Sequence, residues 1–289
     1  MCKHSFQNGT IGQLNVLSKT LFPPQCRRNV PDIRCPSEDV DIAMRDSTAK
    51  ATATNTPMDA PVPDHPEKTE EALFPRDCSE IDQSQSRASG LYEVRPAGGN
   101  PSFQVYCDMD TDGGNWTVFQ RRSDGTVLFS RGWIDYKTGF GNPASEHWLG
   151  NDKIYQMTSQ RNYELRIDMT DEEGSTRFAK YEFFRIDNET MKYRLHIDGY
   201  LGDAGESMDG HNGAAFSTWD SNNDESSILN CARQFSSGWW FKGCFWVNLN
   251  GLYRLGKKTH YCIIWKDVKG THTLKSTEMK MRPASLEKK

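Results

Sequence analysis

The residues best suited to chemistry in this chain form a short acidic segment, residues 220–225, which reads Asp-Ser-Asn-Asn-Asp-Glu. Oxygen-bearing side chains recur along it, and a turning loop can direct several of them at one ion. Oxygen atoms are the ligands that Ca²⁺ prefers. The segment is not an EF-hand, because Glu225 stands where that loop needs glycine and Cys231 where it needs a bidentate carboxylate. The spacing leaves two interpretations open, an irregular calcium loop and a solvated acidic loop.

Two glycine-rich motifs resemble nucleotide-binding loops without their usual context. Residues 139–144 match G-x-G-x-x-A, but Pro143 stands where the helix of a dinucleotide fold would begin. Residues 251–257 resemble a P-loop, but Lys258 replaces the hydroxyl residue that would hold magnesium. The chain also lacks the G-x-S-x-G and H-E-x-x-H motifs, and its seven histidines show no metal-ligand spacing. We therefore predict that the protein is not an enzyme.

The cysteines predict disulfide bonds. The chain has eight cysteines and no C-x-x-C pair, which favours disulfides and an oxidising compartment over a zinc site. Cys231 and Cys244 bracket a Trp-Trp segment, and closing a loop of this size is worth about 3 kcal/mol. A bond between Cys78 and Cys107 would tie the start of the domain to its first hairpin. Cys262 lies in the apolar sequence Tyr-Cys-Ile-Ile-Trp and is predicted to be a buried free thiol.

The first quarter of the chain differs in composition from the rest. It holds few of the aromatic residues and most of the 13 prolines, so it can bury little apolar surface. We predict a disordered or weakly ordered tail and linker over residues 1–73, one domain over residues 74–283, and a short tail over residues 284–289. The first tail contains an odd number of cysteines, which provides a route to a disulfide-linked homo-oligomer through Cys2, Cys26 or Cys35.

Charge and hydropathy exclude two further classes of protein. The net charge is −4 and the basic residues are scattered, which is unlike a nucleic-acid-binding face. No stretch approaches the ~20 apolar residues of a membrane span. The cysteines and the sequons at Asn8, Asn115 and Asn188 predict a secreted glycoprotein. Residues 1–25 contain no standard secretion signal, so we expect an incomplete N-terminus or another route of export.

The local patterns predict an α+β domain. Residues 103–107 and 116–121 flank an Asp- and Gly-rich turn and predict a hairpin. Apolar residues alternate over residues 163–168, which predicts a half-buried strand. Residues 151–160 predict a helix, and after Gly199 the periodicity fades into a loop-rich final third.

Side-chain positions follow from the same patterns. Tyr181 and Phe183 repeat the period of two, which predicts that both face the same side of a strand. In the helix, Ile154 and Met157 share one face, and an Asp side chain is expected to cap the N-terminus.

Taken in order, these motifs resemble the fibrinogen C-terminal domain family. The resemblance runs from Phe74 to Pro283, nearly three quarters of the chain. Its most specific elements are Thr-Asp-Gly-Gly-Asn-Trp-Thr-Val-Phe-Gln-Arg-Arg (111–122), Trp-Leu-Gly-Asn-Asp (148–152), Phe-Ser-Thr-Trp-Asp (216–220), Asn-Cys-Ala (230–232), Asn-Leu-Asn-Gly-Leu-Tyr (248–253) and Thr-Glu-Met-Lys-Met-Arg-Pro (277–283).

The resemblance implies a three-part fold and a calcium loop. It implies a disulfide-tied N-terminal piece, a central antiparallel sheet with helices, and a loop-rich C-terminal subdomain. Calcium would be held by the side chains of Asn222 and Asp224 and by backbone carbonyls near Ser226 and Ile228. Asn222 replaces the family's usual acidic residue, which removes one negative charge. We therefore expect a weak, structural calcium site.

The resemblance also implies a ligand pocket beside that loop. In the lectins of the family, aromatic side chains pack an acetyl methyl group and backbone N–H groups bind its carbonyl oxygen. Two positions depart from the lectin pattern, because Phe245 replaces a histidine and Phe235 stands where tyrosine is frequent. The alternative is that these aromatic residues only pack the subdomain. The corresponding residues are Phe235, Trp240, Phe241, Gly243, Cys244, Phe245 and Tyr261.

Two functions fit this resemblance, and both are non-enzymatic and extracellular. The first is lectin-like binding of acetylated glycans in innate immunity, as in ficolins and techylectins. The second is binding to a matrix or receptor protein, as in tenascins and angiopoietins.

Overall fold

The computed structural model describes residues 74–81, 88–99, 101–270 and 272–284. The chain divides into two units, Met1–Val62 and Pro63–Lys289, and all the described residues belong to the second. Cys2, Cys26, Cys35 and Asn8 lie outside the described residues. The strands are β1 (Gly90–Val94), β2 (Phe103–Asp108), β3 (Trp116–Arg122), β4 (Phe140–Gly141), β5 (His147–Trp148), β6 (Tyr163–Thr170), β7 (Thr176–Ile186), β8 (Leu195–Gly202), β9 (Val247–Asn248), β10 (Ile264–Trp265) and β11 (Ser276–Pro283). The α-helices are α1 (Trp133–Thr138), α2 (Asn151–Gln160), α3 (Cys231–Phe235) and α4 (Lys266–Lys269).

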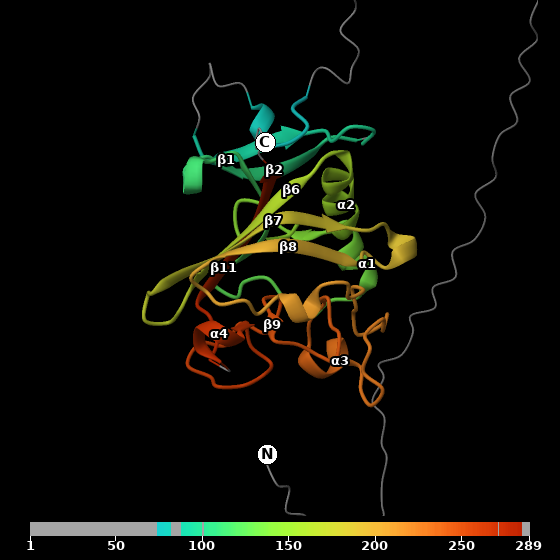
Figure 1. Cartoon of the computed structure of the whole chain (residues 1–289), viewed down its shortest axis with the longest axis vertical. Coiled ribbons are helices and arrows are strands. Elements are labelled where there is room, and N and C mark those ends of the chain that lie inside the picture. The colour runs from blue at the N-terminus through green and yellow to red at the C-terminus, as the bar shows by residue number, and fades with distance from the viewer. Residues whose placement is uncertain (1–73, 82–87, 100, 271, 285–289) are drawn as a thin grey trace, which may run out of the picture. The chain divides into compact units, whose positions relative to one another are not determined.

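A large antiparallel sheet forms the centre of the domain. Its main strands follow the order β1-β2-β3-β11-β6-β7-β8, and β5 joins it beside β3. The last strand of the chain, β11, therefore lies between β3 and β6 (Figure 1). The predicted α+β class and central antiparallel sheet are confirmed.

The two faces of the sheet have different chemistry because side chains alternate along each strand. On β11, Met279 and Met281 are fully buried on the core face, where β6 contributes Leu165. Glu278 and Lys280 lie on the opposite face and form ion pairs there. The alternation in the sequence thus produces one apolar face, which other elements must pack against, and one charged face.

The position predicted for Phe183 is wrong because β7 contains a bulge. Tyr181 pairs with Leu165, but Phe184 rather than Phe183 pairs with Tyr163, so β7 has one extra residue here. Phe184 is fully buried, whereas Phe183 is only half-buried. A bulge shifts the inward-facing side chain by one position, which a period of two in the sequence cannot show.

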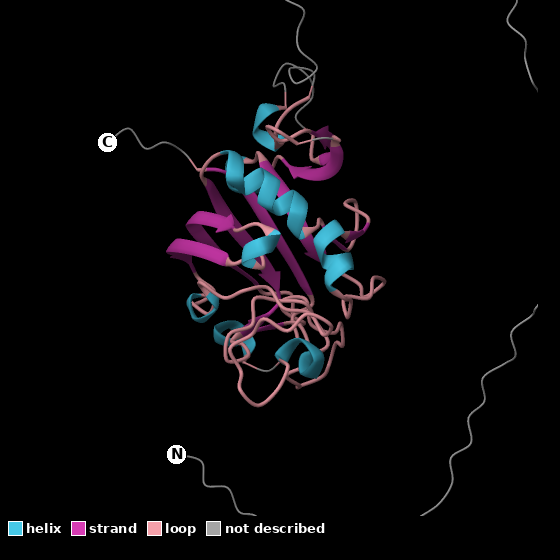
Figure 2. Cartoon of the chain, turned by 90° about the vertical axis from the view of Figure 1, so that its right-hand side faces the viewer, coloured by secondary structure: helices cyan, strands magenta, loops and turns pink. Residues whose placement is uncertain are grey.

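Helices α1 and α2 lie on the apolar face of the sheet (Figure 2). The predicted helix over residues 151–160 is confirmed, with Ile154 and Met157 fully buried and the helix packed against β7. The predicted Asp cap is wrong. The N-cap is Gly150, with a φ of 110°, and a Cβ there would lie 2.6 Å from the backbone of Thr138.

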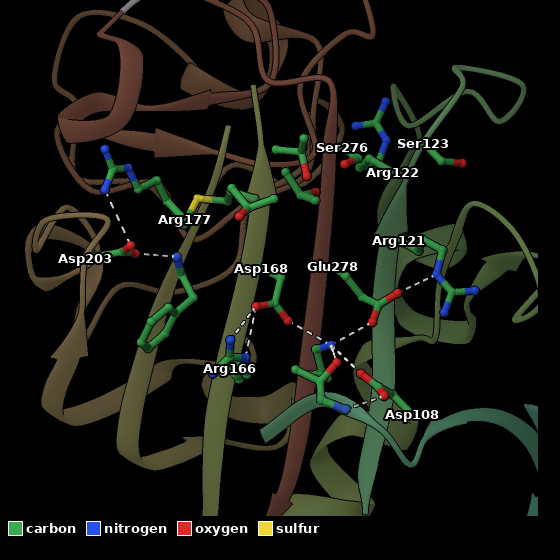
Figure 3. A pocket seen from close by; sticks show the side chains of 17 residues that line it. Asp108, Arg121, Arg122, Ser123, Arg166, Asp168, Arg177, Asp203, Ser276 and Glu278 are labelled. Atoms are coloured by element: carbon green, nitrogen blue, oxygen red, sulfur yellow. Dashed lines mark hydrogen bonds and ion pairs between the residues drawn. The ribbon is translucent and has the colours of Figure 1, made fainter. Parts of the chain in front are cut away.

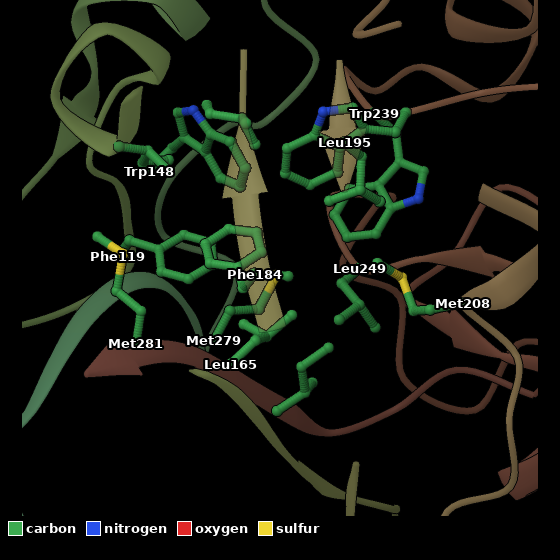
Figure 4. Packing of buried hydrophobic residues seen from close by; sticks show 14 of the residues in the cluster. Phe119, Trp148, Leu165, Phe184, Leu195, Met208, Trp239, Leu249, Met279 and Met281 are labelled. Carbon is green, nitrogen blue, oxygen red and sulfur yellow. The ribbon is translucent and has the colours of Figure 1, made fainter. Parts of the chain in front are cut away.

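One aromatic core runs from the sheet into the loop-rich third of the chain (Figure 4). Phe119 of β3 stacks on Phe184 of β7, with ring centroids 5.5 Å apart. The ring centroid of Trp148 lies 5.9 Å from that of Trp240, which lies 5.3 Å from that of Phe216. The loops of this third are therefore packed by aromatic side chains, in place of regular strands and long helices.

Buried polar side chains of β3 hold the C-terminal loops against the sheet. The Gln120 side-chain amide donates to the Leu249 carbonyl and to Asn250 Oδ1, both at 3.1 Å. Arg122 Nη1 donates to the carbonyls of Leu249 and Gly251 at 3.1 and 2.7 Å. These bonds satisfy carbonyls that no strand pairing reaches, and they fix the loop to the sheet.

Candidate functional site

A disulfide and a short helix brace one side of the C-terminal subdomain. Cys231 and Cys244 are bonded, with Cα atoms 5.3 Å apart, and Cys78 and Cys107 form the second bridge. These are the two pairs that the spacing indicated. Asn230 caps α3, since its side chain accepts from Arg233 N at 2.8 Å. The bridge thus links the start of α3 to the loop that follows Trp240 and Phe241.

Three aromatic side chains gather at the surface beside this bridge. Phe235, at the end of α3, meets Phe245 edge-on with ring centroids 4.7 Å apart, and lies 5.8 Å from the ring of Tyr261. The hydroxyl of Tyr261 accepts from Gln234 Nε2 at 3.0 Å. Tyr261 is 39% exposed, and the two phenylalanines are half-buried. We call Phe235, Phe245 and Tyr261 the aromatic trio.

Trp240 and Phe241 lie behind the aromatic trio and not on its surface. Both side chains are fully buried, and Trp240 Nε1 donates to the Tyr193 carbonyl at 2.8 Å. Phe241 supports Phe245 from below, with ring centroids 5.9 Å apart. The structure therefore places these two residues in the core, as support for the predicted wall.

A cleft of about 370 Å³ opens next to the trio. Gly243, Cys244 and Phe245 line it, so three of the predicted residues meet there. Trp246 and Gly210, which the sequence did not suggest, complete its wall with Lys242. Phe235 and Tyr261 lie outside its lining, which differs from the single receptacle that the resemblance implied. The trio and the cleft thus share Phe245 and form adjoining surfaces.

Trp246 and Gly210 also line a second cleft, of about 290 Å³. The Trp246 side chain is 49% exposed, and the Lys266 ammonium lies 3.1 Å from the ring centroid. The second cleft is lined by carboxylates, namely those of Glu206, Asp209 and Asp267. In the sequence, Trp246 is one of eight tryptophans, and no motif indicates that its side chain is exposed.

A buried histidine fixes the segment that carries these clefts. His211 Nδ1 lies 2.8 Å from the Trp240 carbonyl, while Nε2 lies 3.2 Å from Trp246 N and 3.1 Å from Val247 N. Because the two amides must donate, Nε2 is the acceptor and Nδ1 carries the proton. Burial lowers the pKa of His211 to about 4, although its bond to the Trp240 carbonyl opposes this shift. His211 is therefore neutral at physiological pH.

The predicted calcium loop is held together by its own hydrogen bonds. The two carboxylate oxygens of Asp224 accept from Ser226 N and from Cys231 N, each at 2.9 Å. Asn222 and Ile228 are exposed, with Ile228 87% accessible. Asp220 lies apart from this set, because its side chain accepts from Trp133 N at the start of α1.

The donors present fit a weak calcium site. They are all oxygen atoms, as Ca²⁺ prefers, but Asp224 supplies the one carboxylate of the predicted set. Across the described ranges, no group of three or more His, Cys, Asp and Glu side chains is arranged to hold a metal ion. Calcium here would depend on Asp224, the Asn222 amide and backbone carbonyls.

A cavity of about 460 Å³ lies elsewhere, on the charged face of the sheet (Figure 3). Lys280 of β11 is one of the residues that line it, is only 3% exposed, and contacts Asp108, Asp168 and Glu278 at 2.6, 2.8 and 2.9 Å. Burial alone would lower the pKa of Lys280, but the carboxylates outweigh burial and raise it. Since these charges neutralise one another, the groove is a structural network, and no functional residue is assigned to it.

The remaining predicted positions differ in accessibility. Asn188 is exposed and accepts from Met191 N at 3.2 Å, whereas Asn115 is half-buried with a φ of 66°.

Among the described cysteines, Cys262 has no disulfide and is fully buried. None of the described helices is long and apolar enough to cross a membrane.

The sequence model for the C-terminal globular domain of fibrinogen beta and gamma chains matches residues 74–284. The chain belongs to this family. Solved structures of fibrinogen-like domains support this assignment. The fibrinogen-like globe domain of human ANGPTL2 superposes with a TM-score of 0.71 and 39% identity, covering 73% of this chain and 100% of that one. Lamprey fibrin D-dimer, in complex with the peptide Gly-His-Arg-Pro-amide, superposes with a TM-score of 0.68 and 36% identity. The match covers 74% of this chain and 75% of that one.

Its curated relatives carry names from two functional classes. Techylectin-5A of Tachypleus tridentatus is 45% identical over 217 residues, which are 72% of this chain and 74% of that protein. Angiopoietin-4 of Bos taurus is 42% identical over 218 residues, 73% of this chain but 43% of that protein. The family thus includes a lectin by name and angiopoietins at similar identity, so similarity alone does not favour either function.

Proposed function

We propose that this protein is a non-enzymatic, extracellular recognition protein whose fibrinogen-like domain binds acetylated glycans in innate defence. The observation that supports this most is the aromatic trio of Phe235, Phe245 and Tyr261, half-exposed beside a cleft lined by Gly243 and Cys244. The Cys231–Cys244 disulfide braces this surface group, and the fully buried ring of Phe241 supports Phe245.

The chemistry of the surface suits an acetylated sugar. Aromatic rings pack against methyl and C–H groups, and the neighbouring backbone offers polar partners for an amide. Neither Phe235 nor Phe245 carries a hydroxyl or imidazole. Apolar packing must therefore provide most of the affinity, and we expect individual sites to be weak.

A glycan array, probed with and without a calcium chelator, tests the proposal. We expect saturable binding to N-acetylhexosamine glycans that falls at least about tenfold in Phe235→Ala, since full burial of a phenylalanine side chain is worth about 1.5–3 kcal/mol. Leu201→Ala removes an exposed apolar side chain from β8 and is the matched control, with unchanged binding expected. Glycan binding that Phe235→Ala leaves intact would contradict this assignment of the site.

Binding to a matrix or receptor protein is the second candidate. Exposed apolar side chains support it, because Trp219, Ile228 and Leu229 are 47%, 87% and 38% accessible around the acidic loop. Asn230 Nδ2 donates to the Trp219 carbonyl at 3.3 Å, which brings the two segments together. An empty glycan array, with cell or matrix adhesion that is lost in Ile228→Ser, would favour this candidate.

We also propose that the loop around Asp224 binds calcium weakly and that Asn188 is glycosylated. Asn188 lies in an exposed turn, whereas the residues after Asn115, Trp116 and Thr117, are fully or almost fully buried. A mobility shift on deglycosylation that Asn188→Gln abolishes tests the second point.

A further inference from the structure

The loop over residues 254–260 carries a set of basic side chains without ion-pair partners among the described residues. Arg254, Lys257, Lys258 and His260 are all exposed. Within the part of the chain that the structure describes, these four side chains form no ion pair. We call residues 254–260 the basic loop. The pattern contrasts with the sheet, where Arg121, for example, lies 2.6 Å from Glu278.

The backbone of the basic loop is anchored, so the positions from which its basic side chains project are defined. Leu252 N donates to the Tyr261 carbonyl at 2.8 Å and closes the base of the loop. Gly256 has a φ of 71°, and its N–H donates to the Glu172 carboxylate in the β6–β7 hairpin. Lys258 forms an isolated bridge with His272. A fixed loop loses less conformational entropy on binding than a free one.

Further basic side chains lie beside this loop. Lys275 is exposed, and its backbone N–H donates to the Thr170 carbonyl at 2.8 Å, next to the hairpin that receives Gly256. His272, across from Lys258, is half-buried. Three acidic residues of the β6–β7 hairpin, Asp171, Glu172 and Glu173, border this surface, and the four basic residues Arg254, Lys257, Lys258 and Lys275 outnumber them by one. The surface is therefore a local basic patch on a chain of net charge −4.

The basic loop and the aromatic trio are adjacent in the sequence. His260 directly precedes Tyr261, whose ring lies 5.8 Å from Phe235. We infer that the basic loop is the charged part of the glycan site and that the ligand class is an anionic polysaccharide, with sulfate or carboxylate groups next to acetylated hexosamine units. This inference rests on the proposed function.

An anionic polysaccharide fits this surface better than a membrane. Peripheral membrane segments combine basic residues with several apolar side chains that enter the lipid. In the basic loop, Leu255 is the exposed apolar residue, at 45%. Exposed cations attract a polyanion at long range, and this attraction weakens as salt shortens the Debye length to about 8 Å or less.

The test uses the full chain with heparin as the probe. We expect retention on immobilised heparin and elution at higher salt than from a sulfopropyl resin. Lys257→Gln/Lys258→Gln should weaken binding to a heparin octasaccharide about tenfold, at roughly 0.7 kcal/mol for each lost charge contact. Lys257→Arg/Lys258→Arg should retain binding, because the charges remain.

The matched control is Arg185→Gln/Lys192→Gln, which removes the same number of charges at the other end of β7. The strand has eleven residues at ~3.3 Å each, so Arg185 near its end lies roughly 30 Å from the hairpin that holds the basic loop, and Lys192 lies in the turn that follows the strand. The control should change heparin affinity less than about twofold.

Three outcomes would overturn the inference: equal elution from heparin and sulfopropyl resin, equal losses in test and control variants, or binding to phosphatidylserine vesicles without binding to heparin. The proposed function is tested separately, by binding of the protein to beads that carry uncharged N-acetylglucosamine. Binding there depends on Phe235 and not on Lys257 or Lys258, so either idea can fail alone.

Discussion

Single buried side chains hold the loops of this domain by completing backbone hydrogen bonds. Glu146 is fully buried, and its carboxylate accepts from Ser123 N, Gly125 N and Val127 N at 2.9, 3.1 and 2.9 Å. His211 does the same for the segment after Trp240 with a neutral ring. His211 thus holds the segment that lines the clefts, whereas Glu146 holds the loop over residues 123–127.

The neutral state of His211 predicts a loss of stability in acid. Its pKa is about 4 in the folded protein and about 6.5 when unfolded, so the unfolded chain takes up the proton first as pH falls. The stability that depends on neutral His211 is complete above about pH 6.5 and is lost progressively down to about pH 4. The difference of roughly 2.5 pH units corresponds to about 3 kcal/mol. Urea unfolding at pH 7 and pH 4.5 measures it.

His211→Gln provides the comparison, because an amide keeps one donor and one acceptor but does not titrate. We expect it to be less stable than the wild type at pH 7, with a difference that shrinks at pH 4.5. A difference that stays the same at both pH values would show that His211 does not titrate in this range.

At the scale of elements, the acidic loop is a segment whose shape depends on side-chain contacts and not on strand pairing. Asp224 closes it by accepting from Ser226 N and Cys231 N, and Asn223 joins it to the Phe216 carbonyl at 2.8 Å. With one carboxylate in the predicted ligand set, a bound Ca²⁺ would be poorly neutralised. The loop is therefore suited to weak binding of the ion.

We predict a calcium Kd of roughly 10⁻⁴–10⁻³ M, the range of extracellular modules. Isothermal titration calorimetry should show a binding heat that disappears in Asp224→Ala. In Asp224→Asn, which keeps a hydrogen-bond acceptor, the heat should also fall because the charge is gone. Glu225→Ala, at an exposed neighbouring acid, should bind as the wild type does. No heat in the wild type, or an unchanged heat in Asp224→Ala, would disprove the site.

At the scale of the whole molecule, weak individual sites favour multivalent binding. Linking several copies raises the effective concentration of each site and can increase affinity by about 10²–10⁴-fold. Cys2, Cys26 and Cys35 offer covalent links between chains, since the described cysteines other than Cys262 are paired within the domain.

We predict a disulfide-linked oligomer that dissociates in reductant. Gels run with and without reductant should show a multiple of the 32.9 kDa mass only in its absence. A triple Ser variant at Cys2, Cys26 and Cys35 should be monomeric on both gels, whereas Cys262→Ser should still oligomerise. An oligomer that persists in the triple variant would exclude the tail cysteines as its cause.

The sequence by itself determined the local elements and the covalent framework. The helix over residues 151–160 and the β2–β3 hairpin follow from periodicity and turn residues, which act over a few neighbours. The Cys231–Cys244 bridge follows from spacing, because a short loop brings its ends together at small entropic cost. The acidic loop and the aromatic residues were also visible, but not which of them reach the surface.

Only the tertiary structure decided burial and pairing between distant segments. It placed β11 between β3 and β6, turned Phe184 inward through a bulge, and buried Trp240 and Phe241 while leaving Phe245 and Tyr261 at the surface. It also gave His211 its role, which depends on backbone groups 29 to 36 residues away. These outcomes depend on which segments pack together, and a local pattern does not contain that information because it repeats wherever the backbone period does.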